Sequence, residues 1–128
     1  MPTSKCIFCS IIEKNTPEAR VMENKHAIAI LDVHPISKGH TMVVPKEHTE
    51  TILQLSNESI GPVFELVREV VKKLKKELFE GGNDEGFTIG INHGINAGQV
   101  IQHLHIHIIP RHKGDGGKSI HSVVELRN

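Results

Sequence analysis

The chain has no tryptophan or tyrosine, only two cysteines and no long hydrophobic run among its 128 residues. No stretch approaches the ~20 apolar residues of a membrane-spanning helix, so we expect a soluble protein with no membrane partner. Lysine plus arginine and aspartate plus glutamate both total 15, which leaves no net positive field to attract a nucleic acid. The N-terminus has no apolar run of signal-peptide length, so we expect a cytoplasmic protein.

The sequence does contain ten histidines, a high number for its length. Histidine titrates near neutral pH and is the commonest metal ligand, so an excess that is not a purification tag points to chemistry. The cysteines, Cys6 and Cys9, are separated by two residues. In a reducing cytosol such a pair indicates metal ligands or a redox pair rather than a structural disulfide, and one Cys-x-x-Cys does not decide between them.

Length and hydrophobic periodicity predict one α+β domain over residues 1–128. A short helix is expected at 6–14, ending before Pro17, and a long amphipathic helix at 56–79, ending at Gly81-Gly82. The apolar face of the long helix consists of Ile60, Val63, Phe64, Val67, Val70, Val71, Leu74 and Leu78. Alternating runs predict five strands, at 19–23, 26–31, 41–44, 87–92 and 102–109. The short connections favour an antiparallel sheet with the long helix packed on it.

Three histidines alternate with apolar residues in the last predicted strand. Because side chains on a strand alternate between faces, His103, His105 and His107 are expected on one face at ~6.5–7 Å intervals. The outer two would then lie ~13 Å apart, too far to bind one metal ion together, so the three must divide between roles. The loop at 93–99 is rich in glycine and asparagine and can present backbone N–H groups to an anion.

The stretch at 92–109 resembles the signature of the histidine triad (HIT) family, His-apolar-His-apolar-His-apolar-apolar preceded by Gly-Gln. Upstream segments at 6–9, 31–33 and 38–48 match in the same order. The resemblance covers residues 6 to about 111 and is closest to the small nucleotide-binding branch, among microbial members with Cys-x-x-Cys. It implies a HIT-like fold and leaves residues 112–128 as a tail that matches nothing.

The resemblance implies nucleotidyl transfer or hydrolysis at the α-phosphate of a purine nucleotide derivative. His105 would be the nucleophile that carries the nucleotide, with its second nitrogen held protonated by a backbone carbonyl. His107 would contact the phosphate or the leaving group, and His40 would support His105 from the neighbouring strand. The donors to the phosphate oxygens, where charge develops, would be Gly98, Gln99 and the Val100 amide.

The same resemblance places the nucleoside against Leu31, Asp32 and Val33, with the Asp32 carboxylate accepting from the ribose hydroxyls. On turn chemistry alone Asp32 would be a turn residue before Pro35. Asn92 would contact the ribose or the phosphate. Many relatives have serine where this chain has Val100, so a hydroxyl toward the phosphate or leaving group is missing here.

A structural zinc ion is the cofactor that the resemblance implies, with Cys6, Cys9, His48 and His103 as ligands. A Cys-x-x-Cys pair is half of a tetrahedral site, and a closed site needs two more nitrogen or sulfur ligands. His48 and His103 match the family's zinc positions, which leaves His105 and His107 for phosphate chemistry. The alternative is a pair of free thiols without metal.

Several functions remain open at this point. The enzyme would be a nucleoside phosphoramidase or a dinucleoside polyphosphate hydrolase, because both attack the same phosphorus with different leaving groups. A nucleotide-binding adaptor with incidental hydrolysis is an alternative from another class, and a metal-dependent hydrolase is a third. A homodimer is the family expectation, since the last helix and the sheet edge need covering.

Overall fold

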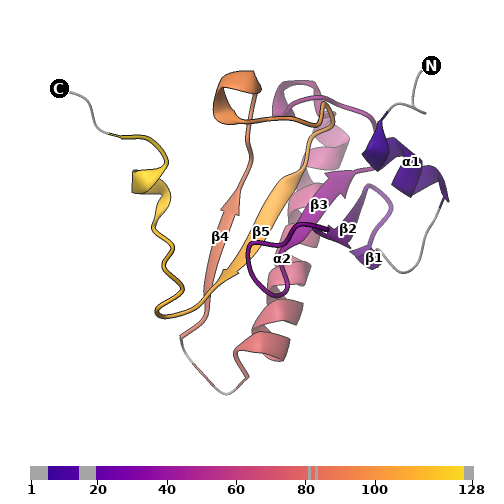
Figure 1. Cartoon of the computed structure of the whole chain (residues 1–128). Coiled ribbons are helices and arrows are strands. Elements are labelled where there is room, and N and C mark those ends of the chain that lie inside the picture. The colour runs from indigo at the N-terminus through magenta and orange to yellow at the C-terminus, as the bar shows by residue number, and fades with distance from the viewer. Residues whose placement is uncertain (1–5, 15–19, 81, 83, 126–128) are drawn as a thin grey trace.

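Two α-helices and five strands form in the residues that the computed structural model describes, 6–14, 20–80, 82 and 84–125. In chain order they are α1 (Ile7–Lys14), β1 (Arg20–Glu23), β2 (Ala27–Leu31), β3 (Thr41–Pro45), α2 (Asn57–Leu78), β4 (Gly86–Gly90) and β5 (Ile106–Arg111) (Figure 1). Short 3-10 turns lie at η3 (Ile52–Gln54), η4 (Ile95–Ala97) and η5 (Ile120–Ser122). The predicted limits at Pro17, Ala19 and Gly81 lie outside the described residues.

The strands form one antiparallel sheet in the order β1-β2-β3-β5-β4. β5 lies between β3 and β4, so His107 is opposite Met42 on one side and Gly90 on the other. The predicted fold class, an antiparallel sheet of five strands with one long and one short helix, is confirmed.

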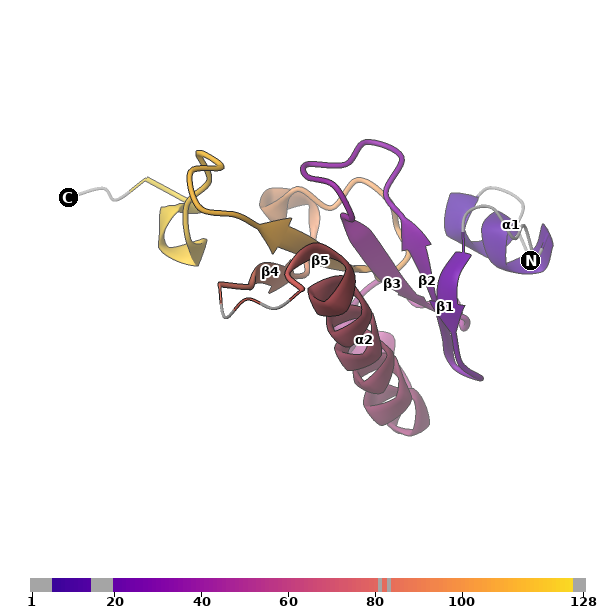
Figure 2. The ribbon, with the colours of Figure 1, turned by 90° about the horizontal axis from the view of Figure 1, so that it is seen from below.

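Both faces of the central strands are covered, α2 on one and α1 on the other (Figure 2). Ala27, Ala29 and Val43 belong to the core under α2, whereas their neighbours Ile28 and Ile30 pack with Phe8 of α1. A strand buried on both faces is apolar throughout, which explains the unbroken apolar run of β2. The α1 side of this sheet carries the histidines described below.

The apolar stripe of α2 is narrower than predicted. Val63, Val67, Val70 and Leu74 are buried against the sheet as expected, together with Leu66, which was not in the predicted set. Ile60 and Phe64 are wrong predictions, because their side chains are 42% and 40% exposed. The sheet covers only the stripe that faces it, so the positions on its flank stay open to solvent.

The last strand begins later than predicted. β5 starts at Ile106, so His103 and His105 lie before it, and only His107 is a strand residue. The reason is that the Leu104 N–H donates to the Thr49 carbonyl at 2.7 Å instead of joining the sheet. The prediction that all three histidines belong to one strand is therefore wrong for His103 and His105.

After β5 the chain leaves the sheet on the β4 side, and residues 112–125 are all exposed (Figure 1). The first turn of this segment is held by Asp115, whose carboxylate accepts from Arg111 and from the N–H groups of His112 and Gly117. The Arg111 guanidinium is the main reason that the pKa of Asp115 lies well below its usual range.

Among the described helices, none combines the length and apolar character needed to cross a membrane.

Candidate active site and metal centre

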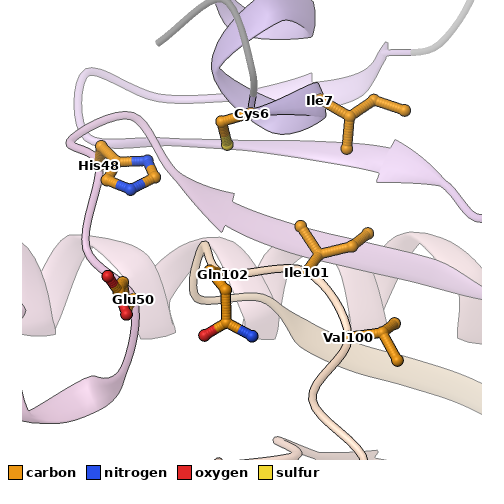
Figure 3. A pocket seen from close by; sticks show the side chains of 7 residues that line it. All are labelled: Cys6, Ile7, His48, Glu50, Val100, Ile101 and Gln102. Atoms are coloured by element: carbon orange, nitrogen blue, oxygen red, sulfur yellow. The ribbon is translucent and has the colours of Figure 1, made fainter. Parts of the chain in front are cut away.

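Two cavities meet at the loop before β5. The first, which we call the histidine pocket, has a volume of about 380 Å³ and lies on the α1 side of the sheet. The second, the side pocket, measures about 390 Å³ and is lined by Cys6, Ile7, His48, Glu50, Val100, Ile101 and Gln102 (Figure 3). Ile7, Val100 and Ile101 line both, so the two pockets share a wall.

The histidine pocket brings together most of the residues predicted to bind a nucleotide. They are Leu31, Asp32, Val33, Asn92, Gly98, Val100, His105 and His107. Its apolar wall comes from Phe8, Ile11, Ile30 and Met42, which were not predicted as site residues. The signal for Ile30 and Met42 was present in the sequence, because they alternate with residues of the α2 core and so face the other side.

His105 has its tautomer fixed by the backbone. Its Nδ1 lies 2.8 Å from the carbonyl oxygen of His103, and a carbonyl can only accept, so Nδ1 carries the proton. The lone pair is therefore on Nε2, as a nucleophile requires. The rings of Phe8 and His107 pack against His105, with centroids 5.1 and 5.0 Å away. The expectation that a backbone carbonyl holds this imidazole is confirmed.

His107 has the opposite tautomer. The Ile36 N–H donates to Nδ1 of His40 at 3.1 Å, so the proton of neutral His40 is on Nε2. Nε2 of His40 lies 3.0 Å from Nδ1 of His107 and donates to it. Because Nδ1 of His107 accepts, the proton of neutral His107 is on its Nε2. His40 thus contacts His107 rather than His105, so any support that it gives to His105 acts through His107.

Both of these histidines are neutral at pH 7. Burial, with smaller effects of His105 and His40, lowers the pKa of His107 to about 4. Burial also lowers the pKa of His40, against the opposing effect of Asp32. The Asp32 carboxylate lies 3.5 Å from Nε2 of His40 and 3.9 Å from Nδ1 of His107. These distances do not make ion pairs, because the two imidazoles are uncharged.

The loop before β5 is held by Gln99. The buried side-chain amide accepts from the Gly94 N–H at 2.8 Å and donates to the Glu50 carbonyl at 2.7 Å. The backbone N–H groups of Gly98 and Gln99 donate within the loop, to Ile95 and Gly94. The prediction that Gly98 and Gln99 donate to phosphate is therefore not supported. Of the three predicted donors, Gly98, Gln99 and Val100, the Val100 N–H has no hydrogen-bond partner among the described residues.

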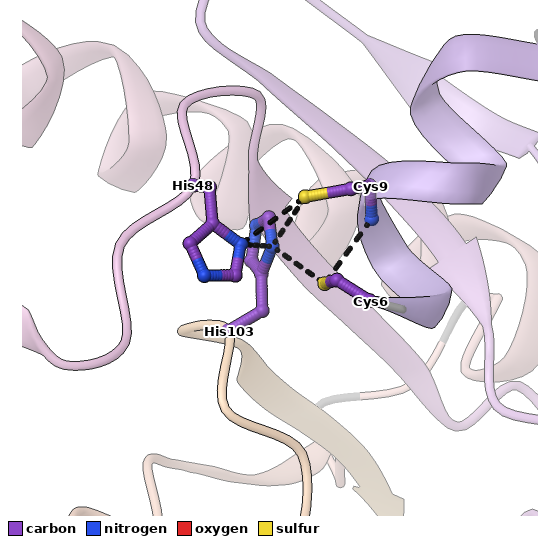
Figure 4. Close-up of side chains that lie close together, drawn as sticks. All are labelled: Cys6, Cys9, His48 and His103. Carbon is purple, nitrogen blue, oxygen red and sulfur yellow. Dashed lines mark hydrogen bonds between the residues drawn. The ribbon is translucent and has the colours of Figure 1, made fainter. Parts of the chain in front are cut away.

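Cys6, Cys9, His48 and His103 converge on one point (Figure 4). Nδ1 of His103 lies 3.3 Å from Sγ of Cys6 and 3.5 Å from Sγ of Cys9. Nδ1 of His48 lies 3.1 Å from Sγ of Cys9 and 3.2 Å from Nδ1 of His103. Bonds of about 2.3 Å to sulfur and 2.05 Å to nitrogen put tetrahedral zinc ligands roughly 3.3–3.8 Å apart. The four donors can therefore hold one tetrahedral metal ion.

The surroundings of this cluster also suit a metal. Nε2 of His103 donates to the Pro45 carbonyl at 2.9 Å, so Nδ1 turns its lone pair toward the two sulfurs. Burial lowers the pKa of His103, which keeps the imidazole neutral. Burial raises the pKa of the Cys9 thiol to about 11, so a bound cation is what would favour the thiolate.

Asp32, His40 and His107 form a second group with metal-ligating atoms close together. Metal binding at Nε2 of His40 would require a lone pair there. The Ile36 N–H donates to the other nitrogen of this ring, which places the proton on Nε2. The group is therefore hydrogen-bonded in a way that opposes metal binding, unlike the cysteine cluster.

Comparison with known proteins identifies the family. The family model of the HIT domain matches residues 13–114. The chain belongs to the HIT family. A HIT-like protein of Methanocaldococcus jannaschii, itself uncharacterized, is 43% identical over 111 residues, which are 87% of this chain and 82% of the relative.

Two further HIT relatives bear on the chemistry. The adenosine 5′-monophosphoramidase of Schizosaccharomyces pombe is 35% identical over 115 residues, 90% of this chain and 80% of the relative. The crystal structure of a Zn-bound histidine triad family protein from Mycobacterium smegmatis has a TM-score of 0.74 at 32% identity, covering 89% of this chain and 80% of that one. This HIT chain thus has relatives named for a phosphoramidase activity and for bound zinc.

Proposed function

We propose that this HIT protein hydrolyses a purine nucleotide derivative at the α-phosphate through a nucleotide carried on His105. The observation that carries this proposal is the pair of opposite tautomers, a free lone pair on Nε2 of His105 beside an N–H on Nε2 of His107. A nucleophile next to a neutral donor, in one pocket, is what attack on a phosphate needs.

The reaction would proceed in two displacements. Nε2 of His105 attacks the α-phosphorus, and the bond from phosphorus to the leaving group breaks. The Nε2–H of His107 and the Val100 N–H donate to the phosphate or to the departing atom, where negative charge develops. Water then attacks the phosphorus and the His105–phosphorus bond breaks. One proton of the water passes to solvent, the nucleotide is released and neutral His105 is restored.

The base would lie against the apolar wall of the histidine pocket, between Phe8 and Ile30, with Leu31 and Val33 at its edge. Asn92 and Asp32 supply the polar groups nearest the ribose. Asp32 is turned toward His40 and accepts from the His34 N–H through one oxygen, so we propose that it contacts the ribose through the other.

The leaving group is proposed to be an amine, which makes the protein a nucleoside phosphoramidase. This choice rests on two HIT relatives named adenosine 5′-monophosphoramidase, from Schizosaccharomyces pombe and Candida albicans. Dinucleoside polyphosphate hydrolysis, the other reaction expected from the sequence, uses the same nucleophile and differs only in what leaves.

We also propose that zinc is structural and that residues 1–128 act as a single domain within a homodimer. Four protein ligands would fill a tetrahedral site and leave no position for water, so the ion would supply stability rather than a nucleophile. In that role Cys6 and Cys9 would join α1 to His48 and to His103, beside the end of β3 at Pro45.

The test is to trap the nucleotide on the enzyme. Adenosine 5′-phosphoramidate, mixed briefly with the full chain and quenched in alkali, should give one AMP on the peptide containing residues 102–109. His105→Asn should lose both the label and turnover, while the exposed His121→Asn keeps both. A label on another residue, or turnover in His105→Asn, would contradict the proposal.

A further inference from the structure

The side pocket has a polar half and an apolar half (Figure 3). Ile7, Val100 and Ile101 form the apolar half, and these are the residues that it shares with the histidine pocket. His48, Glu50 and Gln102 form the polar half. A group attached to a phosphate beside the Val100 N–H therefore has two directions open to it, the histidine pocket and the side pocket.

Glu50 gives the side pocket its charge. Its carboxylate has no hydrogen bond or ion pair in the part of the chain that the structure describes. The seven lining residues include neither lysine nor arginine. Zinc would not change this balance, because Zn²⁺ with two thiolates is formally neutral. The pocket is thus an anionic site with nothing in its wall to neutralise it.

Glu50 is also hydrogen-bonded to the loop before β5, the loop that would face the phosphate of the substrate. Its backbone carbonyl accepts from the Gln99 side chain at 2.7 Å, and Gln99 in turn accepts from Gln102 through its backbone carbonyl at 3.4 Å. The buried Gln99 therefore fixes both polar walls of the side pocket relative to Val100. A binding site built on a rigid support in this way is suited to selecting a substrate.

We infer that the side pocket binds the leaving group, and that it selects an amine whose apolar chain ends in a second, positively charged nitrogen. This inference rests on the proposed function. The nucleoside fills the histidine pocket, the chain of the amine lies along Ile7, Val100 and Ile101, and the distal ammonium reaches Glu50. The P–N bond breaks as the His105–phosphorus bond forms, and the departing nitrogen takes up one proton from solvent while His107 donates a hydrogen bond to it.

The same charge argues against an anionic leaving group. A nucleoside polyphosphate would bring several negative charges to a wall that holds Glu50 and no cation. Like charges at this distance repel, and proteins that bind phosphate chains supply lysine, arginine or a metal ion to offset them. Among the two leaving groups compatible with the nucleophile, the side pocket favours the amine.

Three adenosine 5′-phosphoramidates of equal chain length test this inference. Their amines are 1,5-diaminopentane, with a distal ammonium, n-pentylamine, with none, and 5-aminopentanoate, with a distal carboxylate. We expect kcat/KM for the ammonium substrate to exceed that of the neutral one by about 3–5-fold, and the carboxylate substrate to be worse by a similar factor, as for a partly exposed ion pair. Glu50→Gln should bring the three values to within about twofold of one another, and Glu50→Lys should reverse their order. Glu65→Gln, a matched change on the exposed face of α2, should keep the wild-type order.

Equal kcat/KM for the three substrates, or a preference that survives Glu50→Gln, would overturn the inference. So would faster cleavage of diadenosine tetraphosphate than of all three. Unsubstituted adenosine 5′-phosphoramidate separates this outcome from failure of the proposed function. If it is cleaved and labels His105 while the panel shows no charge preference, only the leaving-group site is wrong. If it neither turns over nor labels His105, the proposed function itself is wrong.

Discussion

His103 holds the imidazole of His105 through its backbone carbonyl while its own side chain points into the cysteine cluster. One residue therefore belongs to both the candidate metal centre and the candidate active site. Displacement of the His103 ring would move the carbonyl that fixes the tautomer of His105. The candidate metal centre, whose four protein ligands would leave no open position for substrate, is expected to control the geometry of the nucleophile.

The first prediction concerns loss of one metal ligand. Cys9→Ser should abolish stoichiometric zinc binding and lower the free energy of unfolding by at least ~2 kcal/mol, since a structural metal stabilises the folded state directly. Zinc per chain and melting temperature are the measurements, and Ser10→Ala, the neighbouring change in α1, is the control. Free thiols with less than a tenth of an equivalent of zinc in the wild type, and an unchanged melting temperature in Cys9→Ser, would refute a structural zinc. Prompt inactivation by a chelator before any unfolding would instead indicate a catalytic metal.

The second prediction concerns His40, which acts through His107. His40→Asn should reduce kcat by ~10–100-fold, as loss of a supporting residue does at other sites, while His105 still takes up the nucleotide. The reason is that His107 loses the donor that keeps its proton on Nε2. Single-turnover labelling of His105 and steady-state turnover separate the two effects. A variant that no longer labels at all would mean that His40 positions the nucleophile itself.

The sequence alone was sufficient to predict the helices and strands whose apolar residues recur at a regular spacing. α2 was predicted to within one residue at each end, and all five strands were found, because their apolar residues recur at the spacing of a helix or a strand. Prediction failed at residues 102–105, which alternate like a strand but are not one. There the Thr49 carbonyl accepts from the Leu104 N–H, and the His103 side chain lies among Cys6, Cys9 and His48. All of these partners come from parts of the chain more than fifty residues away.

Side-chain partners were harder to foresee than positions. The resemblance to the family assigned His40, His105 and His107 to one catalytic site, but only the structure shows that His40 contacts His107. Gln99 was expected to donate to phosphate, whereas its amide is used entirely within the protein. Hydrogen bonds of this kind depend on where the loop folds back, and no local pattern in the sequence encodes that.

The third prediction concerns acid stability. The pKa of His107 is about 4 in the folded protein against an ordinary value of 6.5, so as the pH falls the unfolded chain binds this proton first. The contribution of His107 is therefore fully favourable to folding above pH 6.5 and is lost as the pH falls toward 4. Between pH 7 and pH 5 the unfolding free energy of the wild type should therefore fall by ~1–2 kcal/mol more than that of His107→Asn. Urea unfolding at both pH values measures the difference, with zinc content checked in each sample and His121→Asn as the control. The prediction is wrong if the unfolding free energy falls equally between pH 7 and pH 5 in the wild type and in His107→Asn.

The last prediction concerns the proposed homodimer. In the described part of the chain β4 pairs with β5 alone and so lies at the edge of the sheet, where Ile89 is 45% exposed. Ile60 and Phe64 leave further apolar surface on α2, next to the core that the helix covers. Because unpaired strand edges and exposed apolar side chains are covered in stable proteins, a second copy is expected to bury these residues. Light scattering at micromolar concentration should then give about 28 kDa, twice the 14.2 kDa of one chain.

Aspartate at the same positions provides the test. The double variant Phe64→Asp and Ile89→Asp should shift the mass toward that of one chain, since burying two carboxylates in an interface costs far more than the interface gains. Leu53→Asp, at an exposed apolar residue in η3, should stay dimeric and serves as the matched control. A wild type that has the mass of one chain would remove the dimer. A dimer that tolerates both aspartates would place its interface elsewhere, with the exposed Ile120 and Val123 of the tail as the next residues to change.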